Sequence, residues 1–128
     1  LTIASLIERE TDGSDRAKIA SVIYNRLNNP NAGTQGYLQI DATLYYINGG
    51  KVPTEADKSI DSPYNTYKYK GLPPGPIANP GLESIKAALD PEDTSYYYYT
   101  LGDDKTHHFF KTYEEMQRFM STQELYQS

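Results

Sequence analysis

The stretch Leu1-Thr2-Ile3-Ala4-Ser5-Leu6-Ile7-Glu8-Arg9-Glu10-Thr11 predicts the first helix and contains the most informative residue of the chain, Glu10. Apolar side chains recur here at spacings of three and four, so one helical face carries Ile3, Leu6, Ile7 and Glu10. Glu8 lies about 160° away around the helix axis. A carboxyl group on an apolar face loses hydration, which raises its pKa and lets it act as a general acid near neutral pH. The alternative is that Glu10 marks the surfacing end of the helix, or pairs with Arg9 or Arg16.

The composition fits one globular domain of 128 residues, long enough to bury a core. The net charge is −5 and no basic stripe occurs, so we expect no nucleic-acid partner. The absence of cysteine excludes disulfides, thiolate metal sites and a cysteine nucleophile. Neither a signal peptide nor an apolar run of transmembrane length is present. We therefore expect residues 1–128 to be a single domain excised from a longer protein.

Local signals predict further helices after residue 11. Asp41 is expected to cap a helix over residues 42–47, because Asp is among the best N-cap residues. Thr54 and Asp57 resemble a capping pair for a brief helix over residues 55–58. Each signal is local, so each predicts where a helix begins and leaves its packing open.

The C-terminal half combines one more helix pattern with β-type runs. Asn79-Pro80 is predicted to begin a helix, with Asn79 as its cap and a core face of Leu82, Ile85 and Leu89. Residues 96–101 and 106–111 are β-type runs on either side of a turn, which predicts a hairpin. The expected fold class is α+β, predominantly helical, with a small antiparallel β-hairpin or sheet.

Two polar or rigid segments are candidates for a binding site. Residues 64–81 are rich in Tyr, Pro and Gly, so this loop either holds backbone groups in place for a ligand or is a rigid connector around the core. Asp41 is either a second active-site carboxylate or only a helix cap, and Gln39 offers an amide to a sugar or to solvent. His107 and His108 are adjacent in a predicted strand and point to opposite faces, so we expect no metal site and no cofactor.

Taken together, these segments resemble the catalytic domain of the MltG-type (YceG-like) endolytic murein transglycosylases over nearly the whole chain. The matching segments follow the family's order: Ala4-Ser5-Leu6-Ile7-Glu8-Arg9-Glu10-Thr11, Ala20-Ser21-Val22-Ile23-Tyr24-Asn25-Arg26-Leu27, Leu38-Gln39-Ile40-Asp41-Ala42-Thr43, Tyr64-Asn65-Thr66-Tyr67, Gly71-Leu72-Pro73-Pro74-Gly75-Pro76-Ile77, Asn79-Pro80-Gly81 and His108-Phe109-Phe110. The family often has Pro where this chain has Ala42, a good helix former, so we expect little consequence.

The resemblance implies a predominantly helical, lysozyme-like catalytic domain and a lytic reaction. Such enzymes cleave the β-1,4 bond between N-acetylmuramic acid and N-acetylglucosamine, and the product carries a 1,6-anhydromuramyl end. The catalytic Glu of the family's Glu-x-Glu-Thr motif corresponds to Glu10, acting first as acid and then as base. The resemblance also implies a substrate cleft lined by Gln39, Asp41, Tyr64, Asn65, Tyr67, Gly71, Leu72, Pro73, Pro74, Gly75, Asn79 and His108.

The resemblance places the parent protein at the outer face of the bacterial cytoplasmic membrane. Family members carry a single-pass N-terminal anchor and a small LysM-like domain, neither of which is in this chain. The implied partners are peptidoglycan glycan strands and cell-wall synthesis proteins, with membrane contact only through the anchor. Two alternatives stay open: a glycan-binding or scaffold domain without turnover, and a lysozyme-like hydrolase in which Asp41 positions water.

Overall fold

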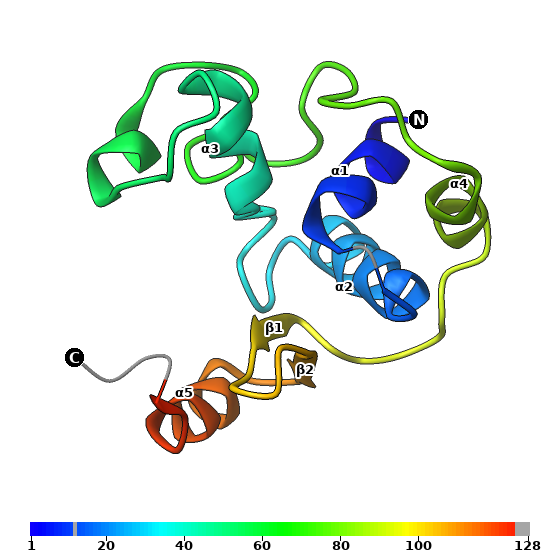
Figure 1. Cartoon of the computed structure of the whole chain (residues 1–128), viewed down its shortest axis with the longest axis vertical. Helices are drawn as coiled ribbons and strands as arrows, with labels where there is room; N and C mark the ends of the chain where they lie inside the picture. Colours follow the sequence, from blue (N-terminus) through cyan, green and yellow to red (C-terminus); the bar gives the residue numbers. More distant parts are fainter. Residues whose placement is uncertain (12, 125–128) are drawn as a thin grey trace.

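The computed structural model describes residues 1–11 and 13–124. Within them the elements follow in the order α1 (Thr2–Glu10), α2 (Arg16–Asn28), α3 (Asp41–Ile47), the 3₁₀ helix η1 (Glu55–Ser59), α4 (Leu82–Leu89), β1 (Tyr98–Leu101), β2 (His107–Phe110) and α5 (Tyr113–Ser121) (Figure 1). Helices with one two-stranded antiparallel sheet confirm the α+β class. None of the helices in the described residues is long and apolar enough to span a bilayer.

Helices α1, α2 and α4 pack against one another and form one side of the molecule (Figure 1). The predicted apolar face of α1 is confirmed, because Leu6 and Ile7 are fully buried and Ile3 packs partly buried against the same core. The rest of this core consists of Ile19, Ala20, Ile23, Leu38, Ile40, Ala42 and Ala87. Fully burying a side chain such as Leu6 contributes about 1.5–3 kcal/mol, so the cluster fixes α1 firmly.

The packed face of α4 differs from the prediction. The helix begins at Leu82, with Gly81 rather than Asn79 at the N-cap. Its buried side chains are Ser84 and Ala87, whereas Leu82 and Leu89 are 65% and 82% exposed, so the predicted leucine core face was wrong. Small side chains let α4 lie close to α1, and the Ser84 hydroxyl donates a hydrogen bond of 2.9 Å to Glu8 there. The positions of the large apolar side chains therefore did not predict which face of α4 packs against α1.

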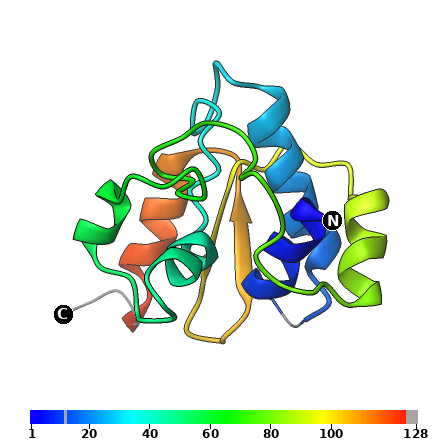
Figure 2. The ribbon, with the colours of Figure 1, turned by 90° about the horizontal axis from the view of Figure 1, so that it is seen from above.

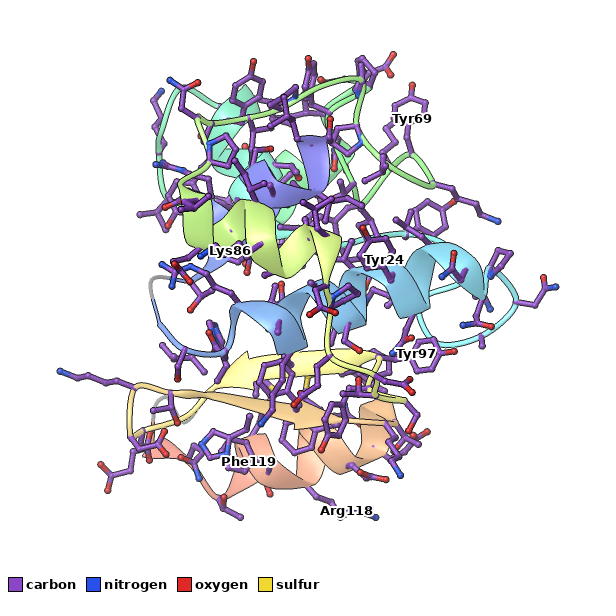
Figure 3. All side chains as sticks on the ribbon, turned by 90° about the vertical axis from the view of Figure 1, so that its right-hand side faces the viewer. Tyr24, Tyr69, Lys86, Tyr97, Arg118 and Phe119 are labelled. Carbon is purple, nitrogen blue, oxygen red and sulfur yellow. The ribbon has the colours of Figure 1, made fainter. Side chains whose placement is uncertain are left out.

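The predicted hairpin is confirmed as strands β1 and β2, which pair with Tyr99 opposite Phe109. On one face of this sheet, Tyr99 and Phe109 pack against the core cluster. On the other face, the rings of His108 and Phe110 contact Phe119 of α5, with centroids 4.4 and 5.4 Å away. The sheet therefore lies between α5 and the group of α1, α2 and α4, as Figures 2 and 3 show.

The two predicted caps near α3 had different outcomes. The capping box of Thr54 and Asp57 at η1 is confirmed in both directions. The Asp41 cap was wrong: Asp41 is the first residue of α3, and its carboxylate accepts a hydrogen bond from the Tyr67 hydroxyl rather than from a helix N–H. Because α3 packs against α1, its first turn lies next to Glu10.

Candidate functional site

Glu10 is the last residue of α1, and its half-buried carboxyl group faces two hydrogen-bond donors. The Tyr99 hydroxyl of β1 donates to Oε2 at 2.9 Å. The backbone N–H of Ala42, in the first turn of α3, approaches Oε1 at 3.4 Å. Three elements far apart in sequence therefore converge on one carboxyl group.

Burial is the main reason that the pKa of Glu10 is raised. The hydrogen bonds from Tyr99 and Ala42 act in the opposite direction and lower this pKa, while the nearby charge of Asp41 raises it. The net result is a carboxyl group that keeps its proton to higher pH than an ordinary glutamate. This is the property required of a general acid, as the helical pattern of α1 predicted.

Arg26 of α2 is buried behind this site, at 6% exposure. Its Nε donates to the backbone carbonyl of Tyr97 at 2.8 Å, and its Nη1 donates to that of Leu38. Its guanidinium lies 5.7 and 5.8 Å from the ring centroids of Tyr98 and Tyr99. Among the described residues no carboxylate pairs with it directly. Arg26 therefore ties the start of β1 to α2 and places a fixed positive charge near Glu10.

Two open hollows lie beside the hydrogen-bonded pair of Glu10 and Tyr99. One, of 670 Å³, is lined by Glu8, Arg9, Glu10, Thr11, Gly13, Ser14, Asp15, Lys18, Leu101, Lys105, Thr106, His107 and Phe109. The other, of 640 Å³, is lined by Arg26, Gly33, Thr34, Gln35, Tyr37, Gln39, Tyr67, Tyr98, Tyr99, Tyr113 and Met116. The hydrogen bond between Glu10 and Tyr99 joins a wall of the first hollow to a wall of the second. An extended ligand that crosses this bond would contact both.

Three predicted cleft residues lie near Glu10. Gln39 and Tyr67 line the hollow beside Tyr99. Gln39 has a left-handed φ of 51°, and its side chain is exposed between the buried residues Leu38 and Ile40. Asp41 is exposed, and its carboxylate is held by the Tyr67 hydroxyl.

Asn65 was predicted to line the cleft, and the structure contradicts this because its side chain is fully buried. The Asn65 amide donates to the backbone carbonyls of Lys58 and Ile60 at 3.0 and 2.9 Å. Its Oδ1 accepts the Tyr67 N–H at 3.0 Å. Asn65 therefore fixes the end of η1 and the position of Tyr67, and has no surface for a ligand.

The other predicted residues of the loop do not reach the two hollows. Neither hollow is lined by Tyr64, Gly71, Leu72, Pro73, Pro74, Gly75 or Asn79. The ring of Tyr64 packs on Tyr46 of α3 at 5.0 Å. The loop is fastened to α1, where Ser5 Oγ accepts the Ile77 N–H at 3.1 Å and Glu8 Oε1 accepts the Gly81 N–H at 2.7 Å. These contacts favour the connector interpretation for most of this loop.

The two histidines point to opposite faces of the sheet, as predicted. His107, rather than the predicted His108, lines the hollow beside Glu10, and its Nδ1 lies 2.7 Å from Asp15 Oδ2. His108 lies on the α5 side, with its Nε2 3.0 Å from an oxygen of Asp104. In the described part of the chain no group of three or more potential ligands is placed to hold a metal ion.

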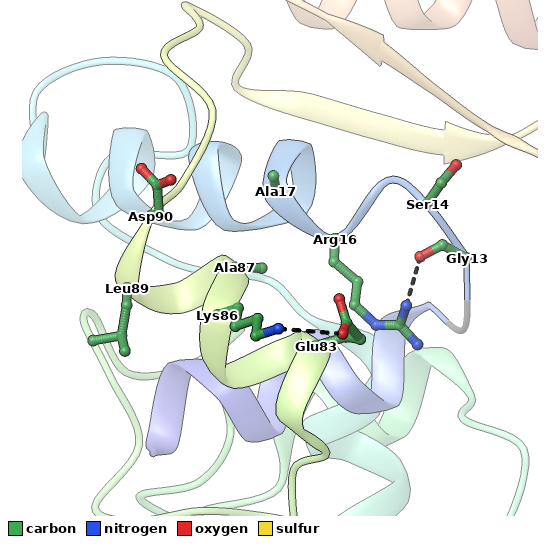
Figure 4. Close-up of a pocket in the computed structure, with 9 residues that line it drawn as sticks. All are labelled: Gly13, Ser14, Arg16, Ala17, Glu83, Lys86, Ala87, Leu89 and Asp90. Carbon is green, nitrogen blue, oxygen red and sulfur yellow. Dashed lines mark hydrogen bonds and ion pairs between the residues drawn. The ribbon is translucent and has the colours of Figure 1, made fainter.

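A third hollow, of 530 Å³, lies between the N-terminal end of α2 and helix α4 (Figure 4). It contains the ion pair of Lys86 and Glu83 at 3.8 Å, and Arg16 donates from Nη1 to the Gly13 carbonyl at 2.8 Å. None of the predicted site residues lines it. The candidate site is therefore the group around Glu10.

The sequence profile of the YceG-like family matches residues 1–122. This chain belongs to the YceG-like family. It is 48% identical over 118 residues to the endolytic murein transglycosylase of Bacillus subtilis (strain 168), covering 90% of this chain and 31% of that relative. It is 39% identical over 107 residues to the endolytic murein transglycosylase of Streptococcus pneumoniae serotype 2, covering 77% of this chain and 18% of that relative. The chain thus spans about a third or less of the length of these relatives.

A crystal structure of a yceG-like protein from Listeria monocytogenes has the same fold, with a TM-score of 0.83 and 45% sequence identity. The match covers 91% of this chain and 38% of the Listeria chain. The resemblance read from the ordered motifs is therefore confirmed at the level of the YceG-like family.

Sequence reasoning missed Tyr99 and Arg26 in this YceG-like site. The run of four tyrosines, residues 96–99, did not reveal which ring faces the core. Arg26 carried a detectable signal, because a charge follows buried apolar residues at helical spacing: Ile19, Val22, Ile23 and Arg26. The same spacing singled out Glu10 on α1, so one pattern marks a buried ionisable residue on each of the two helices.

Proposed function

We propose that this chain is the catalytic domain of an endolytic lytic transglycosylase that acts on peptidoglycan. The bond cleaved is the β-1,4 linkage between N-acetylmuramic acid and N-acetylglucosamine, and the product is a 1,6-anhydromuramyl end. The observation that carries the proposal is the carboxyl group of Glu10, because burial raises its pKa. This carboxyl group lies where two hollows meet, and together they suit an extended chain.

In this mechanism Glu10 has two successive roles. As an acid it protonates the leaving glycosidic oxygen while positive charge develops at C1 of the muramyl sugar. As a carboxylate it then takes the proton from the muramyl C6 hydroxyl, whose oxygen attacks C1. The C1–O bond to the leaving sugar breaks and the C1–O6 bond forms, so water is not consumed. A single carboxyl group suffices, unlike the two carboxyl groups of most glycoside hydrolases.

A hydrolase would need a second carboxylate that holds a water molecule, and the lytic reaction does not. The Asp41 carboxylate accepts a hydrogen bond from the Tyr67 hydroxyl, which fixes its orientation beside the hollow that Gln39 and Tyr67 line. We assign Asp41 and Tyr67, with Gln39, to substrate binding.

The wider setting follows from the same proposal. The helical part would be lysozyme-like, and the longer protein would be tethered at the outer face of the cytoplasmic membrane by a single-pass anchor, with a LysM-like domain beside it. Its substrate would be glycan strands, and its partners would include cell-wall synthesis proteins. The length of the curated relatives supports the presence of further segments.

Product analysis tests the proposal. The full-length wild-type protein and its Glu10→Gln variant are incubated with peptidoglycan strands, and the products are examined by mass spectrometry. We expect anhydromuramyl ends from the wild type only, while Glu10→Gln still binds glycan. Reducing ends without the anhydro mass difference would favour the hydrolase, and cellular function that survives Glu10→Gln unchanged would favour a scaffold.

A further inference from the structure

The two oxygens of the Glu10 carboxyl group have unequal partners. Oε2 accepts a hydrogen bond of 2.9 Å from the Tyr99 hydroxyl, whereas Oε1 has only the Ala42 N–H at 3.4 Å, near the limit of a hydrogen bond. A phenol carries one hydrogen, and here it is directed at Oε2. An oxygen that already accepts this hydrogen is a poor place for the acid proton, which leaves Oε1 as the better place for it.

The position of the Tyr99 hydroxyl is fixed by its surroundings. The ring packs against Phe109 at 6.0 Å, meets His107 edge-on at 5.5 Å, and lies 5.8 Å from the Arg26 guanidinium. Burial and the neighbouring Glu10 raise the pKa of Tyr99 well above its ordinary value. Tyr99 therefore keeps its hydrogen at neutral pH and remains a hydrogen-bond donor to Glu10.

We propose that Tyr99 is a positioning residue, which holds Oε2 of Glu10 as an acceptor and so makes Oε1 the oxygen that gives and retakes the proton. The inference rests on the proposed function and adds a second residue to it. The Tyr99 hydrogen stays on Tyr99 throughout. The transferred proton leaves Oε1 for the glycosidic oxygen, and a second proton arrives at Oε1 from the C6 hydroxyl.

This arrangement also favours the intermediate state of the reaction. When Glu10 has given up its proton, the bond from Tyr99 becomes charge-assisted, and such bonds are about twice as strong as neutral ones. Tyr99 therefore stabilises the carboxylate that must act as base, without preventing its reprotonation at Oε1.

The test compares Tyr99→Phe with Tyr96→Phe. The control removes a hydroxyl from the same tyrosine run and from a ring that also packs on Phe109, at 5.8 Å. For Tyr99→Phe we expect kcat to fall about 10- to 100-fold with KM nearly unchanged, the size expected for losing one hydrogen bond to a charged group. Tyr96→Phe should stay within about twofold of the wild type, since it removes no bond to Glu10.

The pH profile separates positioning from general damage to the fold. The bond from Tyr99 lowers the pKa of Glu10, so its loss should move the falling limb of kcat/KM to higher pH. In a Glu10→Gln background, Tyr99→Phe should have little further effect on the rate. Unchanged kcat or an unmoved limb would overturn the proposal.

A carbon NMR titration of the Glu10 carboxyl group gives a readout that needs no turnover. Tyr99→Phe should raise its midpoint and Tyr96→Phe should not; equal midpoints in all three proteins would overturn the proposal. If the wild type forms no anhydromuramyl ends while Tyr99→Phe still moves the titration, the proposed function fails and the contact of Tyr99 with Glu10 stands. The two failures are thus distinguishable.

Discussion

Helix α1 carries two glutamates whose side chains leave it toward different parts of the molecule. Glu8 faces α4, where its Oε1 accepts the Gly81 N–H at 2.7 Å and the Ser84 hydroxyl at 2.9 Å. The backbone bond from Gly81 is the main reason that the pKa of Glu8 is lowered. Glu10 faces the hairpin and α3, and burial raises its pKa. The pKa values of two glutamates on one helix, two positions apart, are thus shifted in opposite directions.

The difference shows that the environment of the donors matters as much as their presence, since both carboxyl groups accept hydrogen bonds. Gly81 is the N-cap of α4 and Ser84 lies in its first turn, so Glu8 caps that helix from a neighbouring one. Its charge is hydrated and favourable there. The donors of Glu10 do not offset the loss of hydration, so Glu10 retains a proton that it can transfer.

The largest expected difference between Glu8 and Glu10 is the effect of their substitution on activity. Glu10→Gln removes the transferable proton and should lower kcat by about 1,000-fold, within the range for loss of a general acid. Glu8→Gln should stay within about threefold of the wild type, because Glu8 contacts α4 and no reacting group. Release of anhydromuramyl ends, measured at 25 °C with folding checked by circular dichroism, decides between them. A comparable loss in both variants would remove the functional distinction.

Removing a hydrogen-bond partner of Glu8 should lower the stability of the fold rather than the activity. Ser84→Ala removes a fully buried hydroxyl that donates to Glu8, and we expect the free energy of unfolding to fall by about 1 kcal/mol. Ser95→Ala, at an exposed position, is the control and should change little. Urea unfolding measures both. Equal stabilities of the two variants would mean that the contact of Ser84 with Glu8 contributes nothing.

The pH dependence of stability should have opposite signs at the two residues. The folded pKa of Glu8 is lowered, so Glu8 stabilises the fold above the ordinary value of 4.5, and this is lost as pH falls through the folded pKa. The folded pKa of Glu10 is raised, so Glu10 destabilises the fold as pH rises above 4.5 through its folded pKa.

Thermal unfolding across pH measures this opposition. At about pH 7, Glu10→Gln should raise Tm and Glu8→Gln should lower it, and both differences should shrink toward about pH 3.5. Shifts of the same sign at neutral pH would contradict the opposite environments assigned to the two carboxyl groups.

Gly81→Ala should give the smallest effect. The φ of −77° at this position suits alanine, but the added Cβ would lie 3.2 Å from Glu8 Oε1, which is tight. We expect a change in unfolding free energy within about 0.5 kcal/mol. The change should vanish in a Glu8→Ala background, where the contact is absent, and urea unfolding of the single and double variants checks this.

Local signals allowed part of the fold and site to be predicted from sequence. The Thr54 and Asp57 capping box lies within four residues, and the face of α1 that leads to Glu10 lies within eight. The Leu82 and Leu89 face failed because tertiary contacts, here with Glu8, outweighed apolar size. Tyr99 could not be assigned to Glu10, because their contact depends on strand register and on packing between segments 89 residues apart.

That separation has a consequence for when the chain acquires its chemistry. Glu10 is synthesised among the first residues of this segment, but its partner Tyr99 follows 89 residues later. Closing so long a loop is a late, non-local event in folding. Until the hairpin docks, the Glu10 carboxyl group is exposed to water and has the pKa of an ordinary glutamate. The buried acid is therefore assembled only after most of this chain has been synthesised, and a chain that ended before Tyr99 would lack it.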